Sequence, residues 1–240
     1  MIETRIFESP QSVARGFAEF FESLVTQLPA GKQFSVALSG GSTPKLLFQL
    51  WAEEYAGKVD WSRIHFFWGD ERCVSPEDEQ SNFGVAKRLF LDPCGIPETN
   101  VHRVIGESNP LVEAVRYGVE IRETLLPDTG FPRFDLIILG MGTDGHTASI
   151  FPHEMQLMTT DSICAVATHP ESGQKRITLT GRMLDAGQCV VALVTGESKA
   201  DILGSVIRKD ERSKSFPIAG LNPESGMIYF IDQSAAERLG

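Results

Sequence analysis

Hydrophobic residues along this chain alternate between helical and strand-like spacing. Short apolar runs typical of buried strands occur at 34–38, 64–68, 134–139 and 189–194, with further strand candidates at 163–167, 177–179 and 227–231. Helical spacing occurs at 9–28, 45–51, 81–91, 111–125 and 199–207. This alternation predicts an α/β fold with a mostly parallel, doubly wound, Rossmann-like sheet and helices on both faces. No linker divides the chain, so we expect a single domain over residues 1–240.

Composition limits which partners and which cellular compartment we expect for this protein. The net charge is −10, from 22 Lys and Arg against 32 Asp and Glu, which disfavours nucleic acid and anionic membranes as partners. We expect no membrane span and no secretory signal, because long apolar runs are missing and the N-terminal segment is charged. A cytoplasmic protein with reduced thiols and no zinc is therefore expected, since the cysteines are irregularly spaced, at Cys73, Cys94, Cys164 and Cys189.

The strands that are most clearly defined each end in a glycine-rich or charged turn. These turns lie at 39–44, 69–72, 140–146 and 195–199. In open parallel sheets, ligands bind beyond the carboxyl ends of the strands. We therefore expect the four turns to converge on one ligand site.

The first turn, Ser39, Gly40, Gly41, Ser42 and Thr43, links a strand to a helix. Free N–H groups and the positive end of the helix dipole at such a turn can hold a phosphate. The alternative is a tight turn in which Ser42 or Thr43 caps a helix with Pro44 as its first residue. The turn lacks the spacing of a P-loop.

Four charged residues near strand or helix ends are candidates for substrate binding. Asp70 and Arg72 follow a very apolar strand, and the guanidinium fork of Arg72 suits a phosphate. A surface ion-pair cluster is the alternative for this pair. Arg176 opens a strand and Lys199 begins a helix, where the dipole disfavours a lysine without a functional role.

The third turn carries the candidate catalytic residues. Residues 140–145 match G-x-G-x-x-G, but Pro152 follows closely and the next strand lacks the expected acidic end, which disfavours dinucleotide binding. Asp144 and His146 flank Gly145, with 147–149 expected to continue into a short helix. His146 is suited to act as a general base oriented by Asp144.

Two other interpretations of the third turn remain. Asp144 can simply start a helix beside an exposed His146. A metal site formed by Asp144, His146 and His153 is disfavoured by the spacing.

Taken together and in order, these segments resemble the 6-phosphogluconolactonases, within a larger group that includes glucosamine-6-phosphate deaminases. The matching segments are 38–44, 68–72 with 81–83, 139–152, 176–180, and 195–196 with Lys199. The chain departs from the family pattern after Pro152, where His153-Glu154-Met155-Gln156 replaces a glycine-containing run.

The resemblance implies hydrolysis of 6-phosphoglucono-δ-lactone to 6-phosphogluconate in the oxidative pentose phosphate pathway, without metal or organic cofactor. It implies that His146 activates water, and that the turn at 39–43 with the cations Arg72, Arg176 and Lys199 surrounds the phosphorylated lactone. A glucosamine-6-phosphate isomerase/deaminase is the nearest alternative, and Arg72 favours the lactonase. A phosphosugar-binding sensor without catalysis and a Rossmann dehydrogenase are the remaining alternatives.

Overall fold

The main sheet has six strands, all parallel, as the sequence predicts. The computed structural model describes residues 1–125 and 130–239. The strand order is β1-β9-β8-β5-β2-β3. The strands are β1 (Ile2–Phe7), β2 (Phe34–Leu38), β3 (Ile64–Trp68), β5 (Leu136–Leu139), β8 (Val190–Val194) and β9 (Met227–Asp232). The inner strands β2, β5 and β8 are buried at every position, which explains their continuous apolar sequences.

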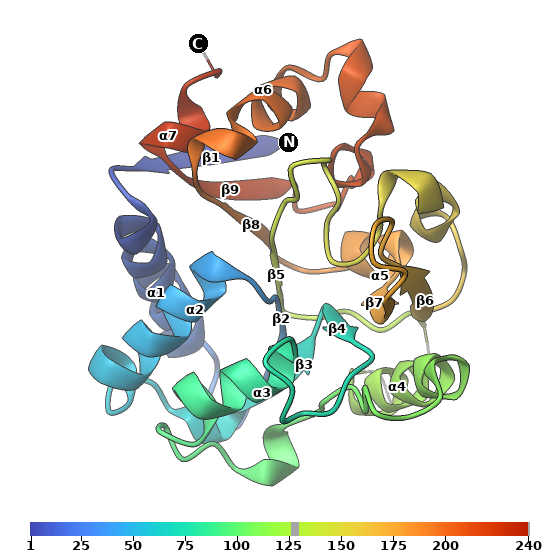
Figure 1. Ribbon diagram of the computed structural model, residues 1–240. Helices are drawn as coiled ribbons and strands as arrows, with labels where there is room; N and C mark the ends of the chain where they lie inside the picture. The colour runs from blue at the N-terminus through green and yellow to red at the C-terminus, as the bar shows by residue number, and fades with distance from the viewer. Residues whose placement is uncertain (126–129, 240) are drawn as a thin grey trace.

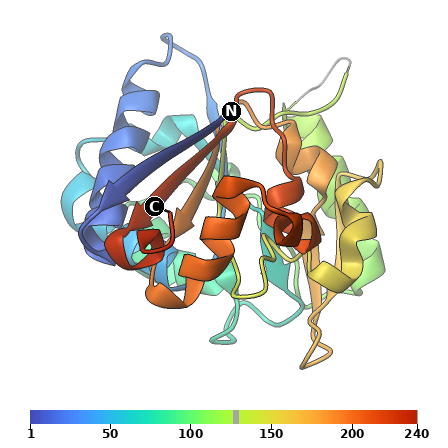
Figure 2. The ribbon, with the colours of Figure 1, turned by 90° about the horizontal axis from the view of Figure 1, so that it is seen from above.

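Helices cover both faces of this sheet (Figures 1 and 2), which confirms the predicted layers. Helices α1 and α2 lie together on one side, and α4, α5 and α6 lie on the other. The helices are α1 (Pro10–Thr26), α2 (Ser42–Leu50), α3 (Asn82–Ala86), α4 (Pro110–Leu125), α5 (Gly181–Asp185), α6 (Ala200–Arg208) and α7 (Gln233–Ala236). None of the described helices is both long and apolar enough to cross a membrane.

Short helical segments of other types extend or connect these elements. Two π-helical segments continue α2 and α3, at Trp51–Tyr55 and Lys87–Leu91. The 3₁₀ segments are Trp61–Arg63, Glu98–Asn100, Pro152–Met158, Glu197–Lys199, Glu211–Ser215 and Pro217–Gly220. Aromatic rings fill the core between α1, α2 and the sheet, where Phe21 lies 4.7 Å from Trp51 and Phe90 lies 5.0 Å from both Trp51 and Trp61, centroid to centroid.

A second, antiparallel sheet was not foreseen from the sequence. Its order is β4-β7-β6, formed by β4 (Asp70–Arg72), β6 (Cys164–Thr168) and β7 (Lys175–Leu179). The charged residues 70–72, expected as a turn, therefore form a short strand that pairs with β7. This pairing joins segments about a hundred positions apart, which local patterns do not reveal.

Two further elements differ from expectation. The strand β1 was not predicted, because its charged residues Glu3 and Arg5 interrupt the apolar pattern at a sheet edge. The predicted helix at 147–149 is wrong: these residues form a turn closed by a bridge between Thr147 and Ile150. Ala148 at its centre has φ of 47°, a left-handed conformation that a right-handed helix excludes.

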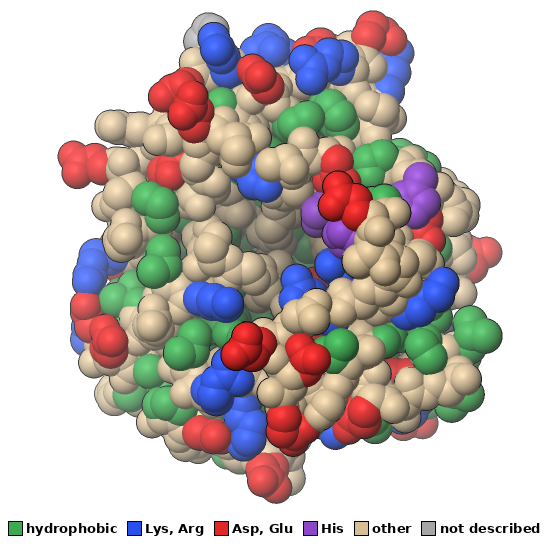
Figure 3. All heavy atoms as spheres, viewed as in Figure 1, with side chains coloured by type: hydrophobic (Ala, Val, Ile, Leu, Met, Phe, Trp, Pro, Cys, Tyr) green, Lys and Arg blue, Asp and Glu red, His purple; other side chains and the backbone are tan. Residues whose placement is uncertain are grey.

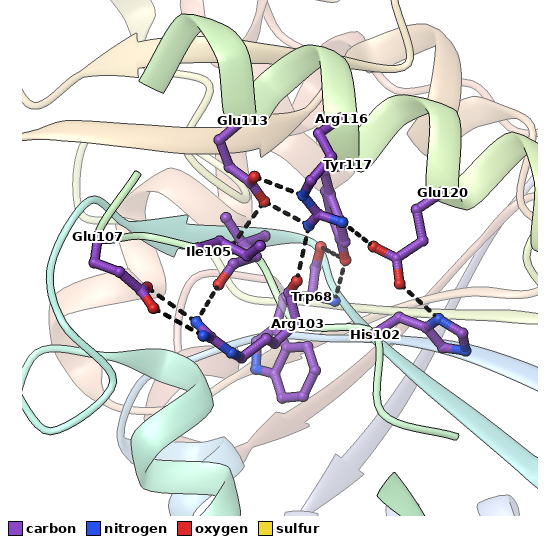
Figure 4. Close-up of polar contacts among 10 residues, drawn as sticks. Trp68, His102, Arg103, Ile105, Glu107, Glu113, Arg116, Tyr117 and Glu120 are labelled. Carbon is purple, nitrogen blue, oxygen red and sulfur yellow. Dashed lines mark hydrogen bonds and ion pairs between the residues drawn. The ribbon is translucent and has the colours of Figure 1, made fainter. Parts of the chain in front are cut away.

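The end of the edge strand β3 is held by helix α4. The hydroxyl of Tyr117 accepts a hydrogen bond from Trp68 N at 2.7 Å and donates one to Trp68 O at 3.1 Å (Figure 4). Arg116 next to it bridges Glu113 and Glu120, and Glu120 also contacts His102 at 2.9 Å. Helix α4 thereby fixes Trp68, the residue that immediately precedes the charged segment 69–72.

We predict that Tyr117→Phe destabilises the fold by about 1–3 kcal/mol, since it leaves a buried N–H and a buried C=O of one edge-strand residue unpaired. Urea unfolding measures this change. The matched control is Tyr229→Phe, because Tyr229 is equally buried. Burial alone raises the pKa of Tyr229, with no hydrogen bond among the causes. Equal stability losses in the two variants would contradict the assigned role of the Tyr117 hydroxyl.

Candidate active site

The four predicted turns meet at one cleft of about 240 Å³, which confirms their expected convergence. The cleft opens at the carboxyl edge of the parallel sheet, where Figure 3 shows a hollow with Lys, Arg and His side chains around it. Asp144 is hydrogen-bonded to Nδ1 of His146 and does not line the cleft. All other predicted residues line it, namely Ser39, Gly40, Gly41, Ser42, Thr43, Asp70, Arg72, His146, Arg176 and Lys199.

The first turn presents the start of α2 to the cleft. The helix begins at Ser42 and its N-cap position is Gly41, at φ of 110°, which has no side chain to cap the helix. The alternative in which Ser42 or Thr43 caps the helix is therefore wrong, and Pro44 is its third residue, not its first. Thr43 Oγ1 lies 2.8 Å from Thr195 Oγ1, which joins this turn to the fourth.

Asn82 is a cleft residue that the sequence analysis did not single out. Its Nδ2 donates to Asp70 O at 2.9 Å, and its side chain packs against the first turn. A Cβ at Gly40 would lie 1.9 Å from Asn82 Oδ1, so only glycine fits there. The sequence signal for Asn82 is its place in the segment 81–83, which matches the family pattern.

Two arginines face each other across the small sheet. Arg72 in β4 pairs with Arg176 in β7. Two positions away along the same antiparallel pair of strands, Asp70 pairs with Thr178. Because side chains alternate along strands, all four lie on the face that adjoins the third turn. Like charges on directly paired positions repel each other, so this arrangement favours an anion between them.

The guanidinium groups are only partly engaged by protein. Arg72 Nη1 donates to Gln80 O at 2.6 Å, and Arg176 Nη1 lies 4.0 Å from Asp70 Oδ2. The Nε atoms of both arginines are buried and find no hydrogen-bond acceptor within 1–125 and 130–239. Burial lowers the pKa of Arg176, and Arg72 adds to that effect while Asp70 opposes it.

Glu71 points to the opposite side of β4 and organises the neighbouring loop. Its carboxylate accepts the N–H groups of Arg72, Asn82 and Phe83 at 2.7–2.8 Å, and the Ser81 hydroxyl at 3.1 Å. Burial raises the pKa of Glu71, and the three backbone bonds oppose this rise. The carboxylate therefore fixes Arg72 and Asn82 against the cleft wall without entering the cleft itself.

His146 and Asp144 form a hydrogen-bonded pair. Nδ1 of His146 lies 2.6 Å from Asp144 Oδ1, which also accepts the His146 N–H at 3.1 Å. A carboxylate at Nδ1 favours the tautomer with its proton there, which leaves Nε2 as a base. A Cβ at Gly142 would lie 2.1 Å from His146 Nδ1 and 2.5 Å from Asp144 Oδ1, so the pair requires glycine at this position.

Burial and nearby charges shift the pKa values of Asp144 and Lys199. Burial alone would raise the pKa of Asp144, but the hydrogen bond and charge of His146 lower it to about 2. Burial lowers the pKa of Lys199, and the nearby Asp144 carboxylate opposes this shift. No group of three or more His, Cys, Asp or Glu side chains in the described part of the chain is arranged to hold a metal ion.

The lowered pKa of Asp144 predicts a pH dependence. An acid with a depressed pKa contributes stability above its unfolded-state value of about 3.9, and this contribution disappears as the pH falls toward 2. His146→Ala removes the partner, so the Asp144 pKa should rise and stability should fall less between pH 4 and 2. Carboxyl NMR titration of both proteins measures this, and an unchanged Asp144 pKa would refute the pairing.

Comparisons with known proteins identify the family and the fold of this chain. A family model described as "Glucosamine-6-phosphate isomerases/6-phosphogluconolactonase" matches residues 8–230. The 6-phosphogluconolactonase of Treponema pallidum is 44% identical, with 85% of this chain and 84% of that protein covered. The Haemophilus influenzae 6-phosphogluconolactonase is 42% identical, with 85% of this chain and 86% of that protein covered.

Solved structures show the same architecture. The crystal structure of 6-phosphogluconolactonase from Thermotoga maritima is 28% identical with a TM-score of 0.83, over 97% of this chain and 100% of that one. The 6-phosphogluconolactonase from Trypanosoma cruzi is 26% identical with a TM-score of 0.87, over 100% of this chain and 97% of that one. This chain therefore belongs to the glucosamine-6-phosphate isomerase/6-phosphogluconolactonase family.

Proposed function

We propose that this protein hydrolyses 6-phosphoglucono-δ-lactone to 6-phosphogluconate, a step of the oxidative pentose phosphate pathway. The observation that carries the proposal is the His146–Asp144 pair, 2.6 Å apart, on a cleft that also presents two arginines. Relatives named 6-phosphogluconolactonase at 44% and 42% identity support it. The four cysteines are free thiols, which fits the cytoplasmic location that we propose.

The phosphate of the substrate binds between the first turn and the small sheet. Arg72 and Arg176 supply guanidinium forks, which match phosphate geometry, and the first turn supplies N–H groups at the start of α2. When no substrate is bound, the negative charge of Asp70 partly neutralises the positive charge of these two arginines. Phosphate binding holds the distant lactone carbonyl in position for attack.

Water attacks the lactone carbonyl carbon, C1, while His146 Nε2 takes one of its protons. The resulting imidazolium is stabilised by Asp144, which stays ionised because its pKa is lowered to about 2. Lys199 stabilises the oxyanion. It lines the same cleft, and the charge of the nearby Asp144 affects its pKa. The C1–O5 bond then breaks, His146 returns the proton to O5, and the new carboxylic acid loses its proton to water.

The alternative isomerase/deaminase reaction moves a proton between two sugar carbons and needs a free base there. Asp70 is the carboxylate among the residues that line the cleft, but it is only 6% exposed and accepts the Ser149 hydroxyl at 2.6 Å. This engagement favours the lactonase. Ammonia release from glucosamine 6-phosphate would instead support the deaminase, and tight 6-phosphogluconate binding without turnover would support a sensor.

We predict that His146→Ala lowers kcat by ~10²-fold or more and leaves the binding of inorganic phosphate nearly unchanged, because the base does not hold the phosphate. Proton release from freshly generated lactone measures kcat after subtraction of the spontaneous hydrolysis. His153→Ala is the matched control, since His153 packs on the same Phe151 ring but does not line the cleft. Near-normal turnover of His146→Ala would exclude His146 as the base.

We also predict that Gly142→Ala lowers kcat by ~10²-fold, because the added methyl group displaces the His146 ring from Asp144. Gly57→Ala is the control, since a Cβ at Gly57 meets no atom within 4 Å and its φ is not positive. Both variants are assayed as above after their folding is checked by circular dichroism. Full activity in a folded Gly142→Ala protein would show that the pair geometry is not needed.

A further inference from the structure

Ser149 lies between Asp70 and Arg176, two oppositely charged residues that do not touch directly. Its Oγ is 2.6 Å from Asp70 Oδ2 and 3.4 Å from Arg176 Nη1, while the charged atoms themselves are 4.0 Å apart. All three side chains are nearly or fully buried: Asp70 is 7% and Arg176 11% exposed at the side chain, and Ser149 is 0% exposed. A buried pair of opposite charges would normally close to hydrogen-bond distance, so the gap needs a cause.

The backbone fixes the Ser149 hydroxyl in this gap. Ser149 N donates to Thr178 Oγ1 at 3.1 Å, and Thr178 is the residue paired with Asp70 across the small sheet. The turn that carries Ser149 is closed by the Thr147–Ile150 bridge and by Thr147 Oγ1, which donates to Gly140 O at 2.9 Å. Both the third turn and the small sheet therefore hold Ser149 in place.

The proton of the hydroxyl can serve only one partner. An ionised carboxylate only accepts hydrogen bonds and a guanidinium only donates them. The 2.6 Å contact therefore has Ser149 donating to Asp70, and the 3.4 Å contact has Arg176 donating weakly to Ser149. One acceptor site of the Asp70 oxygen nearest Arg176 is thus already taken, and the Ser149 hydroxyl stands between the two charged groups.

Arg176 is left with unused donor capacity at the cleft. Its Nε is buried, and no acceptor within the described residues binds it. Its guanidinium carbon lies over the Phe151 ring, 5.6 Å from the ring centroid. A closed ion pair with Asp70 would use two of its N–H groups. A phosphate would then have to break that pair before it could bind.

We infer that Ser149 is a positioning residue that keeps the Asp70–Arg176 ion pair open, so that the Arg176 guanidinium stays available to the phosphate of the substrate. This inference rests on the proposed function, which assigns Arg176 to phosphate. It predicts that loss of the hydroxyl lets Arg176 close onto Asp70, and that removal of the Asp70 charge reverses the effect.

The experiment measures binding of inorganic phosphate and of 6-phosphogluconate by calorimetry and NMR titration. Ser149→Ala should raise both Kd values by about tenfold or more, the size expected when a charged hydrogen bond must be broken for binding. Asp70→Asn alone should bind inorganic phosphate at least as well as the wild type. The double variant Ser149→Ala/Asp70→Asn should bind it better than Ser149→Ala does, which a merely structural defect would not produce.

The matched control is Ser35→Ala, because Ser35 Oγ donates to Asp135 Oδ2 at 2.7 Å in a similar partly buried pair at the far end of β2. Ser35→Ala should lose stability and keep its phosphate affinity. Wild-type affinity in Ser149→Ala, or no recovery in the double variant, would overturn the inference. If Ser149→Ala does not fold, weaker phosphate binding in Asp70→Asn overturns it, and wild-type or tighter binding supports it.

Failure of the proposed function is distinguishable from these outcomes. A wild-type protein that binds inorganic phosphate but does not accelerate lactone hydrolysis would refute the lactonase. The order of phosphate affinities among the wild type, Ser149→Ala, Asp70→Asn and the double variant would still decide the role of Ser149.

Discussion

The repulsion between Arg72 and Arg176 is the constraint around which this site is built. The two cations occupy directly paired positions on β4 and β7, with both Nε atoms out of contact with water. In a chain of net charge −10, this local cluster provides the positive potential that a phosphorylated substrate needs. The surrounding carboxylates, Asp70 on the cleft side and Glu71 on the other, compensate the charge and hold the strand that carries Arg72.

The turn that carries the His146–Asp144 pair lies at the same edge of the sheet. Because β2, β3, β5 and β8 are parallel, their carboxyl ends bring the glycine-rich first turn, the strand that carries Arg72 and the His146 turn to one cleft. Glycine makes the close approaches possible, since Gly40 gives room to Asn82 and Gly142 gives room to His146. The proposed reaction thus separates the binding of phosphate from the activation of water.

Local signals explain what the sequence predicts well. Buried strands, their glycine-rich ends and the amphipathic helices are encoded within windows of about ten residues, so the parallel sheet and the turns at its carboxyl edge were predictable. The resemblance to the family was needed to place Arg72, Arg176 and Lys199 around one substrate. The second sheet was not, because β4 and β7 pair over a hundred positions with no local signature. The strand β1 was missed because Glu3 and Arg5 interrupt its apolar pattern at the sheet edge.

Ser149 and Asn82 show the limit most clearly. Both matter through partners that are distant in sequence, since Ser149 meets Asp70 79 positions away and Asn82 packs against Gly40. The helix expected at 147–149 does not form, because contacts with Gly140 and Asp70 hold this segment in a turn. Tertiary contacts thus decide the local structure at the point where the site is assembled.

The central claim is that one cleft holds the phosphate at the arginine pair and presents the reacting carbon to His146. A crystal structure with 6-phosphogluconate bound tests this most directly. We predict that the phosphate lies between Arg72, Arg176 and the first turn, with the C1 carboxylate within about 3 Å of His146 Nε2. A phosphate bound beside His146, with C1 at the arginines or outside the cleft, would contradict the account.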